Sequence, residues 1–214
     1  MNKTLPIVHP LLDAYIQSVT PPRDRALKAM EDRARKHNFP IIGPLVGRAL
    51  FLLARLTHAR RILELGSGYG YSAYWFGKAV GAGGEIICTE GDAGNIALAK
   101  EYHHRGNIRS RITYLEGDAL TSARKLKGSF DIILIDIDKH EYPQALKFAI
   151  SRLRKGGLII TDNVLWSGKV LHAKPDAKTK GILDYTRTAY ASKQLFTVIL
   201  HIRDGVAVSM KTAS

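Results

Sequence analysis

Apolar segments of strand length alternate with helical patterns from residue 59 to the end of the chain. Strands covered by helices on both faces are apolar along most of their length, and this alternation is typical of βαβ units around a parallel sheet. We therefore predict five parallel strands. The segments concerned are residues 61–65, 85–90, 111–115, 130–136 and 158–162.

Two more apolar segments, residues 195–202 and 206–210, close the chain. Asp204 and Gly205 lie between them, and an Asp-Gly pair favours a tight hairpin turn. The hairpin places one antiparallel strand in an otherwise parallel sheet. The predicted fold class is thus α/β, a Rossmann-like doubly wound sheet of seven strands with a C-terminal antiparallel hairpin.

Before residue 59 the pattern is helical. Thr20 followed by two prolines predicts an N-cap and a helix that runs to about Lys36, and residues 44–56 predict a second helix with one buried face. The length of 214 residues is within the range of one α/β domain. We expect a single domain, 1–214, in which a helical cap of residues 1–58 packs on a core of residues 59–214.

Composition limits the compartment. The only cysteine, Cys88, lies in an apolar run, which predicts a buried reduced thiol and no disulfide framework. Pro6 and Pro10 interrupt the apolar stretch after Lys3, and no apolar run approaches the ~20 residues of a membrane span. We expect a cytoplasmic protein without a membrane partner.

The formal net charge of +13 is strongly basic. Such a balance can mark a partner that carries phosphate, but the Lys and Arg residues are scattered along the chain. A solvated basic surface is therefore favoured over a nucleic-acid footprint, which stays open.

A glycine-rich segment, residues 64–72 (ELGSGYGYS), lies between the first predicted strand and a helical pattern. Glycines let the backbone turn tightly and approach a ligand closely, and the start of the next helix offers free N–H groups. The segment indicates a nucleotide-type cofactor or, taken alone, only a turn. Tyr71 stands where the dinucleotide fingerprint has glycine, and no Gly-Lys-Ser/Thr follows to make a P-loop.

Acidic residues follow the next two strands. Glu90 ends the second strand, where an acid can accept hydrogen bonds from ribose hydroxyls or cap a helix. Asp118 and Ala119 follow the third strand, at the same edge of the sheet, and can border an adenine ring or form a plain helix N-cap.

The fourth and fifth strands end in Asp136 and in Asp162-Asn163. Ligands of open α/β sheets bind beyond the carboxyl ends of the strands, so both motifs point to one crevice. Two carboxylates and an amide oxygen suit Mg²⁺, Ca²⁺ or Mn²⁺ better than zinc. Asp162-Asn163 alone can also be a turn.

Histidines and aromatic residues give weaker signals. His140, His103 and His104 can be metal ligands or bases, but adjacent helical residues do not face one site, so His103 and His104 are expected to be solvated. Trp166 and Tyr142 fit either an acceptor pocket or ordinary packing.

Three motifs together resemble the cation-dependent O-methyltransferases, the family of catechol and caffeoyl-coenzyme A O-methyltransferases and their bacterial relatives. They are residues 64–72, the segment Asp136-x-Asp138-Lys139 and the run 162–168 (DNVLWSG). The likeness extends from about Pro40 to Lys211. The glycine motif is richer in glycine than the family's usual form, which leaves the contact of Gly68 open.

The resemblance implies S-adenosylmethionine as methyl donor and a divalent cation, Mg²⁺ or possibly Ca²⁺ or Mn²⁺. It implies metal ligation by Asp136, Asp162 and Asn163, and catalysis by Lys139 as general base together with Asp136. The residues implied for the donor are Ile42, Glu64, Gly66, Ser72, Glu90, Asp118, Ala119, Asp136 and Asp138.

The acceptor expected from the resemblance is a hydroxyl of a small catechol-like or phenolic molecule, and we expect a homodimer. An alternative of the same fold methylates a hydroxylated uridine in tRNA, which the positive charge favours. A noncatalytic binding module is disfavoured, because it would not need the acids together with Lys139.

Overall fold

The computed structural model describes residues 7–213. Its internal contacts divide the chain into two compact units, one made of residues 21–127 and the other of the residues up to 20 together with those from 128 onward. Lys3 and Pro6 lie outside the described residues.

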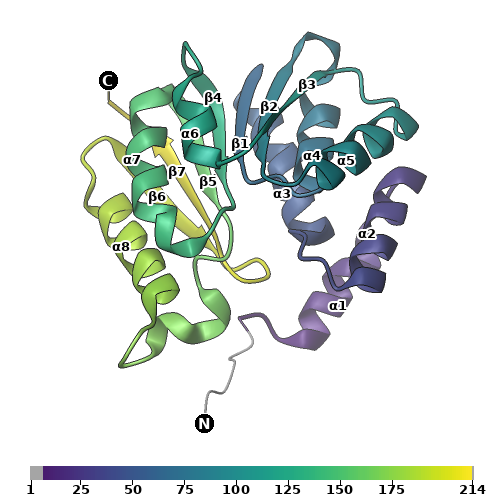
Figure 1. Cartoon of the computed structure of the whole chain (residues 1–214). Coiled ribbons are helices and arrows are strands. Elements are labelled where there is room, and N and C mark those ends of the chain that lie inside the picture. Colours follow the sequence, from purple (N-terminus) through teal and green to yellow (C-terminus); the bar gives the residue numbers. More distant parts are fainter. Residues whose placement is uncertain (1–6, 214) are drawn as a thin grey trace. The chain divides into compact units, whose positions relative to one another are not determined.

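The first unit holds three parallel strands in the order β3-β2-β1 (Figure 1). The register pairs Arg61 with Glu85 and Glu85 with Arg111, so the carboxyl ends of the three strands share one edge. We call this part the β1–β3 unit. Its elements are α2 (Arg25–His37), α3 (Gly43–Leu56), β1 (Arg61–Leu65), α4 (Tyr71–Val80), the short helix η1 (Gly81–Gly83), β2 (Glu85–Glu90), α5 (Ala93–Arg105), β3 (Arg111–Glu116) and α6 (Ala119–Arg124).

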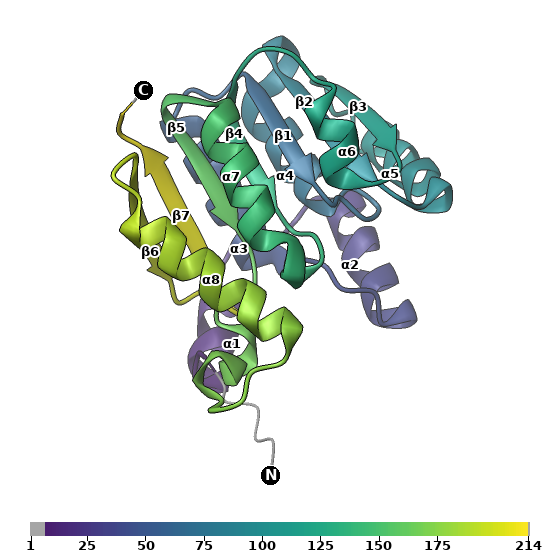
Figure 2. The same cartoon turned by 60° about the vertical axis from the view of Figure 1, so that its left-hand side comes forward.

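The second unit holds the other strands in the order β4-β5-β7-β6. β4 and β5 are parallel, while β7 runs antiparallel to both β5 and β6, as the hairpin predicts. Helices α7 and α8 lie side by side on one face of these strands (Figure 2). The elements of this β4–β7 unit are α1 (Pro10–Val19), β4 (Phe130–Ile135), η2 (Lys139–Glu141), α7 (Tyr142–Arg152), β5 (Leu153–Thr161), η3 (Trp166–Leu171), α8 (Ala177–Ala191), β6 (Leu195–Leu200) and β7 (Val206–Lys211).

The seven predicted strands are all present, and apolar residues of β1, β2, β4, β5 and β7 are buried in the cores of the two units, whereas β3 and most of β6 are only partly buried. β5 differs most from its prediction, because it begins at Leu153 and not at Leu158. The first part of the strand does not show in the apolar pattern, because it contains the polar residues Arg154 and Lys155 and two glycines. Leu153 nevertheless pairs with Phe130 of β4. Cys88 is a free and fully buried thiol, as predicted.

The predicted helix start at Thr20 is wrong. Thr20 ends α1, with an extended backbone (ψ 128°), and α2 begins only at Arg25. A residue before proline is driven away from the helical region, so the two prolines that follow Thr20 separate two helices. Asp24 is the true N-cap, since its side chain accepts the Leu27 N–H at 3.0 Å.

Helix α1 was not predicted, and it belongs to a different compact unit from α2 and α3. None of its residues is buried. The single domain with one helical cap therefore stays a prediction. Over residues 7–213, no helix is long and apolar enough to cross a membrane.

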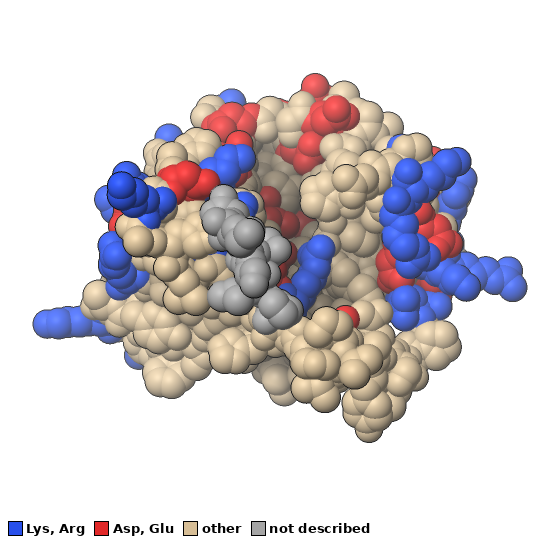
Figure 3. Space-filling model, turned by 90° about the horizontal axis from the view of Figure 1, so that it is seen from below, with Lys and Arg blue, Asp and Glu red and all other residues tan. Residues whose placement is uncertain are grey.

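Basic side chains stand in separate groups on the face drawn in Figure 3, several of them beside Asp or Glu. Exposed ion pairs within helices, such as Arg105 with Glu101 and Arg187 with Asp184, account for part of this mixture. Surface pairs of this kind contribute little to stability. The solvated basic surface stays a prediction.

Candidate active site

The glycine-rich loop after β1 is tied to the end of β2 by backbone donors. The Gly66 N–H donates to the Thr89 hydroxyl at 3.1 Å, and the Gly68 N–H donates to the Glu90 carboxylate at 2.7 Å. Gly66, Gly68 and Gly70 all have positive φ angles. At Gly70 a Cβ atom would lie 2.4 Å from the Tyr114 hydroxyl, so the loop needs glycine there for both conformation and space.

Glu64 and Ser72 meet behind this loop. Glu64 is fully buried on β1, and its carboxylate accepts a hydrogen bond from the Ser72 hydroxyl in the first turn of α4. The Cys88 thiol lies 3.6 Å from the same carboxylate, and burial followed by this negative charge raises the thiol pKa well above its usual value. Cys88 is therefore a protonated packing residue.

The acids after β2 and β3 lie at the carboxyl edge of the strands, as predicted. Glu90 accepts three hydrogen bonds, from the N–H groups of Gly68 and Asp92 and from the Asn95 amide at 3.2 Å. Asp118 caps α6 through the Thr121 N–H at 2.8 Å, and its hydrogen bonds to Thr121 lower its pKa. Both acids thus make loop and helix-cap contacts, which are the sequence-based alternative to binding the methyl donor.

Two further residues that are predicted to bind the methyl donor lie at the start of a helix. Ala119 is the first residue of α6, directly after Asp118. Ile42 comes from another element, the N-cap position of α3, and its side chain is buried. Glu64 and Ser72 thus share a hydrogen bond, and Gly66 and Glu90 bond to neighbouring residues of the same loop and strand end, while Ile42 belongs to α3 of the same unit.

The expectation that His103 is solvated is wrong. His103 is only 8% exposed, and its Nε2 lies 3.0 Å from the Gly70 carbonyl oxygen. Its ring is placed between those of Tyr74 and Tyr114, and burial lowers its pKa. His104 is exposed, so the rule that helical neighbours face different directions holds, but the buried neighbour is His103.

In the β4–β7 unit, Lys139 is the centre of a buried polar cluster. Lys139 is 7% exposed, and its Nζ donates to Asp136 Oδ1 at 3.0 Å and to the Tyr142 hydroxyl at 2.6 Å. The Tyr142 hydroxyl in turn donates to the Asp162 carbonyl at 2.9 Å. Burial and the nearby Asp136 raise the Tyr142 pKa, so this hydroxyl keeps its proton.

Asp162 has an unusual environment for a carboxylate. It is 2% exposed, its Oδ1 has no hydrogen-bond partner, and its Oδ2 lies 4.0 Å from an Arg203 nitrogen. Burial and then the charge of Asp136 raise the Asp162 pKa to about 7, although Arg203 opposes this rise. An unpaired buried carboxylate is unfavourable, and a bound cation compensates such a charge.

The residues around Asp162 fit a hard divalent cation. Asp136 is close enough to shift the Asp162 pKa, and Asn163 follows directly in the chain. Within residues 7–213 no three His, Cys, Asp or Glu side chains gather as a metal cluster, and the candidate oxygen donors are the two carboxylates and the Asn163 amide. Oxygen ligands of this kind suit Mg²⁺, Ca²⁺ or Mn²⁺.

The loop after Asp162 holds three non-glycine residues at positive φ: Asn163 (59°), Trp166 (48°) and Ser167 (51°). The hairpin turn fixes this loop, because the Val164 N–H donates to the Gly205 carbonyl and the Leu165 N–H to the Asp204 carbonyl, both at 3.0 Å. Residues kept in such sparsely populated conformations are over-determined by their surroundings and are common at functional sites.

Trp166 lies beside Lys139, whose Nζ is 5.7 Å from the indole ring, and beside Lys169 at 4.9 Å. Its indole nitrogen is buried without a partner. Asp138, by contrast, is exposed and pairs with Lys178 of α8 at 3.4 Å, and His140 is exposed too. The buried cluster thus contains Asp136 and Lys139 but not Asp138.

Sequence reasoning missed the roles of Arg203 and Thr89, and it did not place Tyr142. Arg203 directly precedes the Asp204-Gly205 turn, and nothing in the spacing connects it with Asp162, 41 positions earlier. Tyr142 follows Lys139 by three residues, a spacing that brings side chains together on a helical turn, so this contact had a readable signal.

Comparisons with known proteins fit this geometry. The O-methyltransferase family model matches residues 19–212. Catechol O-methyltransferase of Niastella koreensis is 36% identical over 166 residues, which are 75% of each chain. Caffeoyl-CoA O-methyltransferase 1 of Eucalyptus globulus is 28% identical over 206 residues, 89% of this chain and 83% of that protein.

The crystal structure of the O-methyltransferase from Bacillus cereus in complex with SAH superposes with a TM-score of 0.85 at 28% identity, covering 94% of this chain and 97% of that one. This likeness confirms the predicted α/β fold class, a mostly parallel, Rossmann-like sheet with an antiparallel end. By the extent of the family match and the identity of its relatives, the chain belongs to the O-methyltransferase family.

Proposed function

We propose that this O-methyltransferase transfers the methyl group of S-adenosylmethionine to a hydroxyl of a small catechol-like or phenolic acceptor with the help of a divalent cation. The observation that carries the proposal is the buried cluster of Lys139, Asp136 and Asp162, with its unpaired carboxylate oxygen. The named activities of the relatives support the acceptor class, and the SAH-bound relative supports the donor.

Seven of the residues assigned to the methyl donor lie in the β1–β3 unit, which holds the glycine loop, and two, Asp136 and Asp138, lie in the β4–β7 unit. Glu90 accepts hydrogen bonds from the ribose hydroxyls, and the first turn of α4, which contains Ser72, offers backbone N–H groups. Glu64 acts through Ser72, since its carboxylate accepts the serine hydroxyl. The full proposed set is Ile42, Glu64, Gly66, Ser72, Glu90, Asp118, Ala119, Asp136 and Asp138.

The cation is assigned to Asp136, Asp162 and Asn163. When bound there, a divalent cation polarises an acceptor hydroxyl and lowers its pKa. The unpaired Asp162 oxygen and the adjacent Asp136 charge support this assignment, because both groups gain from a positive charge at this place.

Lys139 is assigned the general base: its neutral amine takes the acceptor proton at Nζ and becomes the ammonium. Its surroundings are arranged to hold that proton, since the ammonium donates to Asp136 and to the Tyr142 hydroxyl. Tyr142 keeps this hydroxyl in place by donating its own proton to the Asp162 carbonyl. Trp166 stacks beside the ammonium and limits the water that reaches it.

The remaining catalytic gain comes from holding the nucleophilic oxygen and the methyl group in line, an effect that can supply roughly 7–11 kcal/mol. Each motif has a backbone that is fixed within its own unit: hydrogen bonds hold the glycine loop, and the hairpin holds the Asn163–Gly168 loop.

A two-pool labelling experiment tests the proposal. The enzyme receives radiolabelled S-adenosylmethionine together with a panel of small catechols in one reaction and bulk undermodified tRNA in another. The proposed function predicts label in the catechols. Label in the tRNA alone, with a steep loss at higher salt, would show that the RNA-modifying alternative is the true function.

We also propose a homodimer in the cytoplasm. Helix α1 exposes Leu11, Leu12, Tyr15, Ile16 and Val19, and an exposed group of apolar side chains can mark an interface between chains. Light scattering after gel filtration decides the oligomeric state, and a monomer at micromolar concentration would contradict the dimer. The single reduced Cys88 supports a reducing compartment.

A further inference from the structure

Two tyrosines of the glycine-rich segment and a third in the first turn of α4 donate hydrogen bonds from their hydroxyls to helix α2 and its N-cap. Tyr69 donates to the Met30 carbonyl at 2.9 Å, and Tyr71 donates to the Glu31 carboxylate at 2.7 Å. Tyr74 donates to Asp24 at 3.0 Å. The segment that forms the glycine loop and the first turn of α4 is therefore fastened to α2 along its length.

Glu31 is the unusual member of these contacts. It is 5% exposed, on the face of α2 that also buries Leu27, Met30 and Ala34. Arg23 binds both carboxylate oxygens through Nε at 3.0 Å, and its Nη2 adds a contact of 2.7 Å. A buried charge is unfavourable unless it is paired, so packing alone would favour an apolar residue here.

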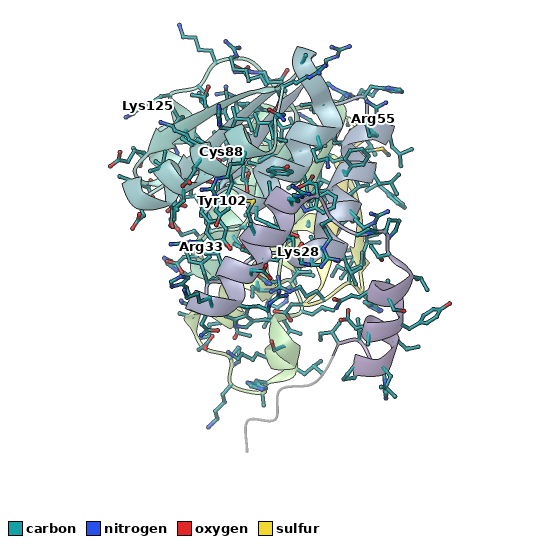
Figure 4. The ribbon with its side chains drawn as sticks, turned by 90° about the vertical axis from the view of Figure 1, so that its right-hand side faces the viewer. Lys28, Arg33, Arg55, Cys88, Tyr102 and Lys125 are labelled. Atoms are coloured by element: carbon teal, nitrogen blue, oxygen red, sulfur yellow. The ribbon has the colours of Figure 1, made fainter. Side chains whose placement is uncertain are left out.

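The Tyr71 hydroxyl uses the remaining hydrogen-bonding capacity of Glu31. Tyr71 is the first residue of α4, between Gly70 and Ser72, and its ring is buried. The path Arg23, Glu31, Tyr71 therefore ends at the helix start that follows the glycine loop. On the other side of Gly70, Tyr69 packs on Phe39 and on Tyr102 of α5, which Figure 4 labels beside α2.

These tyrosine contacts matter because the glycines of the loop give its backbone many accessible conformations. Gly66, Gly68 and Gly70 have far more accessible backbone states than other residues, so the loop loses much conformational entropy when it adopts one shape for a ligand. A contact that fixes the loop before binding removes part of this loss and increases affinity.

We propose that Glu31 is a positioning residue for the methyl-donor site, acting through Tyr71 on the first turn of α4, where the Ser72 side chain meets Glu64. Glu31 touches no reacting atom. The inference rests on the proposed donor function of the glycine loop. Helix α2 then contributes to the affinity for the methyl donor, in addition to packing on the core.

A matched pair of variants tests this. Tyr71→Phe and Tyr74→Phe each remove one hydroxyl that α4 donates to an acidic residue of α2 or its N-cap, but Tyr74 lies almost one turn further from the loop. Calorimetry with SAH measures donor-site affinity without any acceptor. We expect Tyr71→Phe to weaken SAH binding about fivefold and Tyr74→Phe to change it less than about twofold, with similar losses of thermal stability.

Steady-state kinetics add a second readout. Tyr71→Phe should raise KM for the donor and leave KM for the acceptor unchanged. Glu31→Gln retains an acceptor for the Tyr71 hydroxyl and should restore most of the affinity that Glu31→Leu loses. Equal SAH affinities for the two tyrosine variants would overturn the positioning role, even if Glu31→Leu fails to fold. A wild-type protein that binds no SAH would instead contradict the proposed function itself.

Discussion

Carboxylates follow the strands in both units, but their surroundings differ. In the β1–β3 unit, Glu64 and Glu90 are matched by hydrogen-bond donors of the chain itself, and glycines carry the positive φ angles. In the β4–β7 unit, one oxygen of Asp162 has no partner, and Asn163, Trp166 and Ser167 carry the positive φ angles.

This difference indicates two kinds of ligand. A loop whose polar groups are already paired presents a fixed shape and backbone donors, which suit a large cofactor with many hydrogen-bonding groups. A buried carboxylate without a partner has an energetic deficit that a cation corrects. The first unit is thus organised by its hydrogen bonds, and the second retains an unfavourable charge where the proposal assigns the metal.

The largest expected effect concerns Lys139. Lys139→Ala should lower kcat by about 10²- to 10⁴-fold, the usual contribution of a general base, and leave SAH affinity nearly unchanged. Stopped assays with labelled donor measure the rate. Lys169→Ala is the control, because Lys169 also lies over the Trp166 ring but is less buried and has no contact with Asp136 in the cluster. Equal losses of kcat in the two variants would contradict the role of Lys139 as general base.

Metal removal should come next. Prolonged chelation is expected to abolish turnover, and added Mg²⁺ or Mn²⁺ should restore it, while SAH binding weakens less. Mg²⁺ should also raise the melting temperature of the wild type, because a ligand that binds only the folded state stabilises it. Asp162→Ala should lose this shift, whereas Asp184→Ala, at an exposed carboxylate, should keep it. Full activity in the presence of a strong chelator would contradict the proposed requirement for a divalent cation.

A smaller effect is expected at Glu90. Glu90→Ala should weaken SAH binding by about 1–3 kcal/mol, since it removes a charged acceptor and also leaves the Gly68 N–H without its partner. Calorimetry measures the change. Glu90→Gln keeps an acceptor oxygen and should lose less. Unchanged affinity in the alanine variant would leave Glu90 with only its loop and cap contacts.

The smallest effect is a pH dependence of stability from His103. Burial lowers its folded pKa, so below an unfolded pKa of about 6.5 the unfolded chain takes up a proton that the folded chain resists. Stability should therefore fall as the pH drops from about 7 towards the folded pKa. Urea unfolding at pH 7.5 and 5.5 should show a smaller difference for His103→Gln than for His104→Gln, whose parent residue is exposed. Equal differences would contradict this cause.

Local patterns predicted what local physics determines. The apolar runs predicted every strand, including the partly exposed β3 and β6, and the Asp-Gly pair predicted the hairpin. The acids at the strand ends were found because each of them ends or directly follows a predicted strand. Thr20 failed as a cap because two signals, a capping residue and two prolines, competed, and Asp24 offered a better one four residues later.

Contacts between distant segments were beyond reach of the pattern. Tyr71 and Glu31 are 40 residues apart, and His103 and Gly70 are 33 apart, so no periodicity connects them. Their partners are chosen by packing after the elements form. The same holds for Arg203 beside Asp162, and for the early start of β5, where pairing with β4 overrides the polar residues Arg154 and Lys155.

The most direct test compares two acceptors that differ by one hydroxyl. A cation held by three oxygen ligands keeps further coordination positions, since Mg²⁺ prefers six, and a vicinal diol can fill two of them. With saturating Mg²⁺ and labelled S-adenosylmethionine, the account predicts that a caffeate-like catechol is methylated far faster than its single-hydroxyl analogue, and that chelation removes this advantage. Matched rates for the two acceptors would contradict the account.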